Sequence, residues 1–269
     1  MRMSKTAWVL LWTALGAGFA VLYFPLLVVL LNSVNADTTF GWPPKSFTLE
    51  WWGRAVTSEG ALHALWTSVL VGLAATAIAL LLGTMAAFAL QRYRFFGRNS
   101  VSLLIVLPIA LPGIVTGIAL NNAFRTILGV DLGVATVIIA HATFCIVVVF
   151  NNVVARLRRL GGNLEEASMD LGANGLTTFR LVTFPMLRSA VAAGGLLAFA
   201  LSFDEIIVTT FTLGSGMETL PIWIYNNLFR PNQAPVVNVV AAVLIVVSTV
   251  PVYLAQRLSG GESASGGRI

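Results

Sequence analysis

Residues 163–185 read Asn-Leu-Glu-Glu-Ala-Ser-Met-Asp-Leu-Gly-Ala-Asn-Gly-Leu-Thr-Thr-Phe-Arg-Leu-Val-Thr-Phe-Pro. This polar stretch separates two long apolar segments, residues 132–154 and 185–212. Irregular or polar backbone is rarely exposed to lipid, so such a loop is expected in water, where a soluble partner can bind it. The loop is therefore the first candidate for a functional segment.

The residues of this loop carry their own helix-forming and helix-ending chemistry. Asn163 can cap a short helix, with Glu166 at the third helical position reaching back as in a capping box. Gly172 is placed to end that helix, and Asn174 can cap a second short helix that runs through Val182. Pro185 suits the first turn of the next long helix. We predict two short helices with a bend between them.

Composition places the rest of the chain in lipid. Hydrophobic residues make up 57% of the sequence and charged residues 10%, whereas soluble domains carry about 25% charged residues. The net charge of +5 does not indicate nucleic acid, because the basic residues lie at helix ends rather than on one face. Cys145 is the single cysteine, so no disulfide within the chain and no Cys/His metal cluster is expected. His63 and His141 are interpreted as packing or interfacial residues.

Six segments are long and apolar enough to span a bilayer, which takes about 20 residues. They are residues 7–31, 62–90, 100–121, 132–154, 185–212 and 236–256. A cleaved signal peptide is the alternative for the first segment. Its apolar run is too long for that, and no Ala-x-Ala-like site follows neatly, so an uncleaved span is favoured.

The Lys and Arg residues predict the orientation of these spans. All but four of the 16 fall on the side that also holds both termini and the 155–184 loop; the four on the other side are Lys45, Arg54, Arg125 and Arg230. Positive charge marks the cytoplasmic side, so both termini and the loop are expected in the cytoplasm. An even number of spans agrees with this arrangement.

The loop resembles the coupling loop of permease subunits of ABC importers. The family motif is Glu-Ala-Ala, three residues, Gly, nine residues and Ile-x-Leu-Pro. Here it stands as Glu166-Ala167-Ser168, then Gly172, then Val182-Thr183-Phe184-Pro185. Ser replaces the second Ala, Val replaces Ile and Phe replaces Leu, and each change keeps size or apolarity. The spacing is intact, and the resemblance extends over nearly the whole chain.

This resemblance implies an all-α membrane protein with six transmembrane helices, the permease fold of binding-protein-dependent importers, and a coupling helix between spans four and five. Residues 1–258 would form one transmembrane domain with the coupling loop at 155–184, followed by a disordered cytoplasmic tail at 259–269. The implied ATPase-coupling residues are Glu165, Glu166, Ala167, Ser168, Asp170, Gly172, Ala173 and Pro185. The chain has no Gly-x-x-x-x-Gly-Lys-Ser/Thr phosphate loop, so it is expected to be non-catalytic and to bind no cofactor itself.

The partners follow from the same resemblance. A second homologous permease, two ATP-binding subunits carrying ATP and Mg, and an extracytoplasmic solute-binding protein are implied, with the assembly in the inner or plasma membrane. A membrane enzyme or a stand-alone channel is the distant alternative. An enzyme would need a polar catalytic constellation that the sequence does not show, and a channel leaves the loop unexplained.

Five residues are candidates for the substrate pathway. Asp204 and Glu205 interrupt the apolar run of span five about 30 Å beyond Pro185, if the helix is continuous. Carboxylates inside a membrane usually face a cavity or a partner, and one of these two could complement a cationic solute. An interfacial carboxylate, or one paired with a partner's basic residue, is the alternative. The other candidates are Pro108 and Pro112, which bend span three either for packing or to line the pathway, and Trp223, which belongs to a surface belt or an entrance.

Residues 202–211 and 219–223 are similar to the polyamine branch of the family, in particular the second of its two permease subunits. The implied substrate is putrescine or spermidine. Another amine, an amino-acid-like solute or a metal complex is the alternative.

Overall fold

Helices make up the secondary structure of the described residues, apart from one isolated bridge between Asn35 and Phe47. The computed structural model describes residues 4–38, 43–160 and 163–260, with side chains described through Val247. The chain divides into two units, residues 63–223 and residues 1–62 together with 224–269. We describe each unit by itself.

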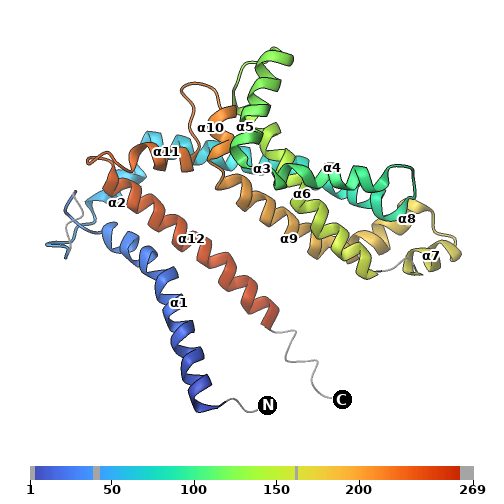
Figure 1. Ribbon diagram of the computed structural model, residues 1–269, viewed down its shortest axis with the longest axis horizontal. Coiled ribbons are helices and arrows are strands. Elements are labelled where there is room, and N and C mark those ends of the chain that lie inside the picture. Colours follow the sequence, from blue (N-terminus) through green and yellow to red (C-terminus); the bar gives the residue numbers. More distant parts are fainter. Residues whose placement is uncertain (1–3, 39–42, 161–162, 261–269) are drawn as a thin grey trace. The chain divides into compact units, whose positions relative to one another are not determined.

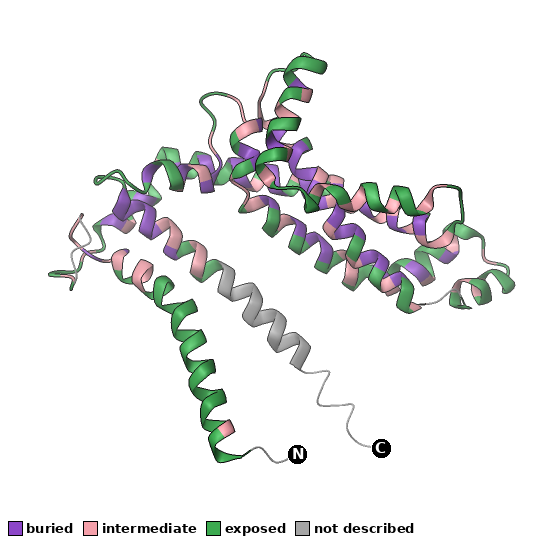
Figure 2. Cartoon of the chain, in the orientation of Figure 1, coloured by how far each residue is buried: buried purple, intermediate pink, exposed green. Residues whose placement is uncertain are grey.

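The larger unit is built around α6 (Val134–Leu160). In the most apolar 18-residue stretch of this helix, 56% of the sequence is buried. The corresponding share is 33% for α3 (Glu59–Arg92) and 28% for the helix that ends at Phe203. Figure 2 colours many residues of α6 purple, which marks them as buried. Small residues let the helices approach closely: a Cβ on Gly83 of α3 would lie 2.9 Å from the carbonyl oxygen of Ile146.

Span three is a bent pair of helices rather than one helix. Helices α4 (Arg98–Ala110) and α5 (Gly113–Asn122) meet at 105°, and a π-helical turn, η1 (Ala123–Ile127), extends α5. The break lies at Leu111, whose backbone is extended, as expected of a residue before proline. The kink predicted at Pro112 is confirmed, and the bent pair covers the segment 100–121 that was predicted as span three. Pro108 lies inside α4 without interrupting it.

The polar loop folds into α7 (Asn163–Asp170) and α8 (Gly175–Thr178). A π-helical turn, η2 (Phe179–Thr183), joins α8 to α9 (Phe184–Phe203), so that the helix runs without interruption from Gly175 to Phe203. The π turn lets Pro185 lie inside this helix, because it bonds the N–H of Phe184 to the oxygen of Phe179, five residues back. The expected separation of the second short helix from span five is therefore absent.

Span five is also shorter than the sequence predicts. Helix α9 ends at Phe203, residues 204–206 form a break, and α10 (Ile207–Thr212) follows. The prediction of one helix over residues 185–212 is wrong. Hydropathy cannot detect this break, because the sequence is apolar on both sides of Asp204 and Glu205.

The smaller unit contains α1 (Lys5–Asn32), α2 (Glu50–Val56) and α12 (Ala234–Gly260), and α12 packs against both of the others (Figure 1). In the most apolar 18-residue stretch of α1, no residue is buried (Figure 2). Trp51 lies in α2 and is buried. The indole Nε1 of Trp51 donates a hydrogen bond of 2.9 Å to the oxygen of Asn35.

Within the part of the chain that the structure describes, four helices are long and apolar enough to cross a membrane, and five spans result if the bent pair counts as one. The part of α12 whose side chains are described, Ala234–Val247, is apolar but shorter than a span. Helix α11 (Leu220–Asn227) lies between α10 and α12 in the sequence. The expected disordered tail begins inside α12, which continues to Gly260, and residues 261–269 lie outside the described residues.

Candidate functional site

The end of α7 is fixed by backbone geometry that only glycine adopts readily. Gly172 has a φ of 87°, in the left-handed region. Its N–H donates to the oxygen of Met169 at 2.9 Å, and the N–H of Ala173 donates to the oxygen of Ser168 at 3.1 Å. This pair of bonds is a Schellman motif, which turns the chain sharply after a helix. The predicted role of Gly172 in ending the helix is confirmed.

Helix α8 begins as the sequence predicts. The Oδ1 atom of Asn174 accepts a hydrogen bond of 2.9 Å from the N–H of Thr177, so Asn174 is its N-cap. The hydroxyls of Ser168 and Thr178 lie 3.1 Å apart and join α7 to α8. Asn163 was predicted to cap this helix from outside, but it is the first helical residue of α7. The two short helices thus form one bent unit, held by a turn, a cap and a side-chain bond.

The two adjacent glutamates of α7 lie in different surroundings. The Oε1 atom of Glu165 accepts hydrogen bonds from Nη2 of Arg92 at 2.6 Å and from the hydroxyl of Thr183 at 2.9 Å. Glu166 is exposed. Sequence reasoning placed both glutamates in one coupling group and gave no role to Arg92 or Thr183. Arg92 is 73 positions away in the chain, so no local pattern could have indicated it.

The bent unit exposes both apolar and acidic side chains. Leu171 is 90% exposed and Leu176 is 78% exposed. Ala167 and Asp170, two more of the predicted coupling residues, are exposed as well. Exposed apolar side chains in a polar loop are candidates for contact with a protein partner.

The break in span five presents its two carboxylates differently. Asp204 is exposed, and Glu205 is half-buried. The Oε1 atom of Glu205 accepts a hydrogen bond of 2.9 Å from the N–H of Val208, which satisfies a free donor in the first turn of α10. Of the two, Asp204 is therefore the one whose carboxylate faces outward, while Glu205 also stabilises the helix that follows.

His141 of α6 holds the two sides of this break, a role that sequence reasoning missed. It is fully buried, its Nδ1 lies 2.7 Å from the hydroxyl of Ser202 in α9, and its Nε2 lies 2.9 Å from the hydroxyl of Thr209 in α10. Thr209 also donates to the oxygen of Glu205 at 2.8 Å. A hydroxyl has one proton, so Thr209 accepts from Nε2–H and Ser202 donates to Nδ1. Of the two roles expected for His141, packing or interfacial, its burial matches packing.

The breaks in spans three and five adjoin each other. A Cβ on Gly113, directly after Pro112, would lie 3.6 Å from Cβ of Ile207, the first residue of α10. Further along both helices, the amide of Asn121 in α5 donates a 2.5 Å hydrogen bond to the oxygen of Phe211 in α10. The structure thus brings Pro112 close to the acidic break.

The two remaining pathway candidates lie elsewhere in the fold. Pro108 is half-buried within α4. Trp223 is 5% exposed, so the surface belt predicted for it does not match its position in α11. The first residue of that helix, Leu220, donates its N–H to the hydroxyl of Ser68 at 2.8 Å. Among the described residues, no group of three or more His, Cys, Asp or Glu side chains could hold a metal ion.

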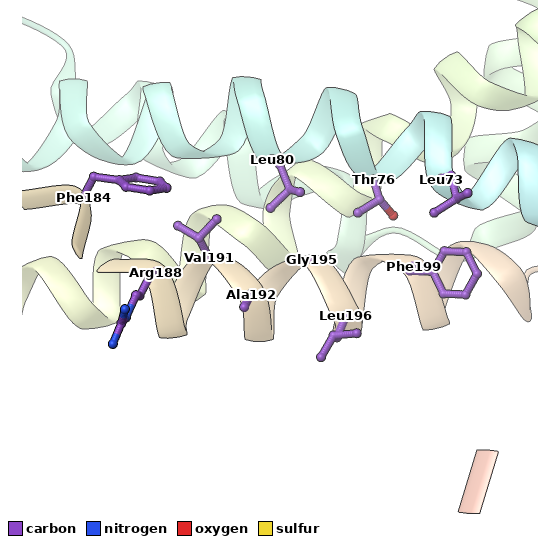
Figure 3. A pocket seen from close by; sticks show the side chains of 10 residues that line it. All are labelled: Leu73, Thr76, Leu80, Phe184, Arg188, Val191, Ala192, Gly195, Leu196 and Phe199. Carbon is purple, nitrogen blue, oxygen red and sulfur yellow. The ribbon is translucent and has the colours of Figure 1, made fainter. Parts of the chain in front are cut away.

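An apolar groove of about 580 Å³ runs between α3 and α9. Leu73 and Leu80 line it from α3, and Figure 3 shows Phe184 and Arg188 at one end and Phe199 at the other. Only one of its lining side chains, Arg188, is charged. Its apolar surface suits a lipid chain or a protein helix rather than a hydrated cation.

Comparison with known sequences identifies relatives along most of the chain. Residues 79–260 match the family described as "Binding-protein-dependent transport system inner membrane component". The spermidine/putrescine transport system permease protein PotC of Escherichia coli (strain K12) is 34% identical over 241 residues, which cover 90% of each chain. The putrescine transport system permease protein PotI of the same organism is 33% identical over 238 residues, covering 85% of this chain and 83% of its own.

Solved structures show the same fold at lower identity. A bacterial ABC transporter involved in the import of the acidic polysaccharide alginate contains a chain that superposes with a TM-score of 0.74 at 17% identity. The match covers 96% of this chain and 99% of that one. A chain of the MetNI methionine ABC transporter, in inward-facing conformations, superposes with a TM-score of 0.57 at 18% identity, covering 74% and 92% respectively.

Proposed function

This chain belongs to the family of binding-protein-dependent transport system inner membrane components, and we propose that it is the permease subunit through which an ATP-driven importer moves a polyamine across the membrane. Its relatives are transport components, and its own helices are those of a multi-pass membrane protein. The observation that carries the proposal is the match to polyamine permeases along 90% of the chain.

The substrate class is proposed from two features. Relatives at 33% and 34% identity are named for putrescine or spermidine/putrescine transport. The break between α9 and α10 exposes Asp204, whose negative charge would complement an alkylammonium group. In an alternating-access cycle, such a charge would bind the solute where two helix breaks, at Pro112 and at Asp204, adjoin.

The remaining features of the importer complete the proposal. Six spans with both termini in the cytoplasm would place α7 outside the lipid as the coupling helix. ATP and Mg would be held by two partner ATP-binding subunits, beside a second permease and an extracytoplasmic solute-binding protein in the cell membrane. The exposed Glu166 and the apolar Leu171 of the bent unit suit a cleft in an ATP-binding subunit.

Uptake measurements test this function. Cells lacking the gene are compared with cells in which it is restored, using labelled putrescine and labelled spermidine. The expected result is saturable uptake that returns only with the gene. Equal uptake in both strains, with the other subunits present, would remove polyamines as the substrate.

A second substrate has one observation in its favour. A relative from Salmonella paratyphi A, 31% identical over 242 residues, bears a provisional name as a 2-aminoethylphosphonate transport system permease. This compound shares an ammonium group with polyamines and adds a phosphonate. Competition of labelled spermidine uptake by an excess of 2-aminoethylphosphonate distinguishes the two: an unaffected rate supports the polyamine, and a strong reduction supports the phosphonate.

A further inference from the structure

We propose that Glu165 is a positioning residue that ties the coupling helix to the transmembrane helices of its own chain, leaving Glu166 to contact the ATP-binding subunit. This inference rests on the proposed function, since it assigns separate tasks to two glutamates of the proposed coupling loop. It changes the sequence-based assignment, which placed both glutamates at the ATPase.

One carboxylate oxygen joins three elements of the structure. The Oε1 atom of Glu165, in the first turn of α7, lies 2.6 Å from Nη2 of Arg92 and 2.9 Å from the hydroxyl of Thr183. Arg92 is the last residue of α3, and Thr183 is the last residue of the π turn before α9. A displacement of α7 therefore acts at once on the end of α3 and on the π turn that leads into α9.

The surroundings of the ion pair between Arg92 and Glu165 favour a strong interaction. The side chain of Arg92 is 25% exposed and that of Glu165 is 20% exposed, so water and salt screen the pair less than a surface pair. The bond is charge-assisted and short. By comparison, the pair of Arg54 and Glu50 in α2 has side chains that are 57% and 59% exposed.

The geometry of the helix separates the two glutamates. Consecutive helical residues point about 100° apart, so Glu165 and Glu166 do not face the same neighbour. Glu165 faces the α3 end and the π turn, and Glu166 is exposed. The exposed carboxylate is available to another subunit, whereas the carboxylate of Glu165 is engaged within its own chain.

Exchange of the two charges tests the tie. In the assembled importer, Glu165→Arg is expected to lower labelled spermidine uptake by about tenfold, equivalent to about 1.4 kcal/mol, with the ATP-binding subunits retained on purification. Adding Arg92→Glu to the same chain should restore most of the uptake. Loss of the ATP-binding subunits in Glu165→Arg, with no rescue by Arg92→Glu, would overturn the proposal and return Glu165 to the ATPase interface.

A matched control and a readout without substrate complete the experiment. Arg94 is exposed and two positions from Arg92, so Arg94→Glu should not rescue Glu165→Arg. Hydrogen–deuterium exchange of peptides covering residues 163–173 should rise in Glu165→Arg. It should fall again in the double variant that also carries Arg92→Glu. This exchange pattern is measurable even if spermidine is not the substrate, so failure of the substrate proposal and failure of the tie are distinguishable. Unchanged hydrogen–deuterium exchange in Glu165→Arg would contradict the proposed positioning role of Glu165.

Discussion

His141 and Ser202 lie 61 positions apart in the chain, yet Nδ1 of the histidine and the hydroxyl of the serine are 2.7 Å apart in the buried interior of the larger unit. Through Thr209 the same imidazole also reaches the far side of the helix break. The position of Asp204 and Glu205 between these contacts is thus set by α6, not by the local sequence.

Replacing His141 is expected to destabilise this part of the protein. His141→Ala removes two buried hydrogen bonds and leaves a cavity, at a cost of about 2–3 kcal/mol. The thermal midpoint of the purified assembly should fall. His63→Ala is the matched control, because His63 is exposed on α3. Equal midpoints for the two variants would show that the His141 contacts contribute no stability.

The two carboxylates of the break are expected to respond differently to substitution. Glu205→Gln keeps an oxygen that can accept the N–H of Val208, whereas Glu205→Ala does not. Glu205→Ala should therefore cost about 1 kcal/mol in stability, and Glu205→Gln should keep the fold. Asp204→Asn should raise the KM for polyamine uptake, because it removes the exposed charge. If KM is unchanged in both Asp204→Asn and Glu205→Gln, neither charge contacts the substrate.

Two glycines of α5 form a matched pair for the packing of the adjoining breaks. In Gly117→Ala the new Cβ would lie 2.8 Å from Cδ2 of Phe211 and 3.1 Å from its Cβ, so α5 and α10 must separate. We expect a loss of about 1–3 kcal/mol in stability. In Gly113→Ala the nearest atom, in Ile207, is at 3.6 Å, an ordinary contact. Thermal unfolding of both variants checks this, and equal midpoints would count against the close packing.

The turn after α7 requires a residue with left-handed backbone conformation at position 172. Gly172→Ala keeps the surroundings, since no atom lies within 4 Å of the new Cβ, but strains the backbone at a φ of 87° by about 1–2 kcal/mol. The expected result is weaker retention of the ATP-binding subunits and slower uptake. Gly175→Ala should be tolerated, because Gly175 has open space and an ordinary helical backbone. Uptake that is equal in the two variants would contradict the need for the turn.

Reversing the charge of Glu166 should disrupt coupling. Glu166→Lys places a positive charge at the exposed position where a basic residue of the ATP-binding subunit is expected. ATP hydrolysis by the assembly should then proceed with little uptake, measured as solute moved per ATP. Glu59→Lys makes the same change at an exposed carboxylate at the start of α3 and serves as the control. Normal assembly and transport in Glu166→Lys would remove this residue from the coupling interface.

The features predicted well from the sequence are those specified by neighbouring residues. Gly172 ends α7 and Asn174 caps α8, because both act on backbone groups within five positions. The kink at Pro112 follows from the missing N–H of proline and the restriction on Leu111. Each of these effects is complete within one or two helical turns.

The features that were missed depend on contacts between distant parts of the chain. The end of α9 at Phe203 is invisible to hydropathy, and the side chain that bridges it, His141, lies on another helix. The partner of Glu165 is on α3, and the burial of Trp223 depends on the packing of α11. Sequence spacing alone does not specify such contacts.

The helix that runs without interruption from Gly175 to Phe203 would also convert a small tilt at one end into a larger displacement at the other. Its 29 residues rise about 43 Å, so a tilt of about 5° at the coupling end shifts the other end by about 4 Å. That far end is the residue before Asp204. A tilt of a few degrees imposed on this helix at its Gly175 end would thus move the acidic break by more than the length of a hydrogen bond.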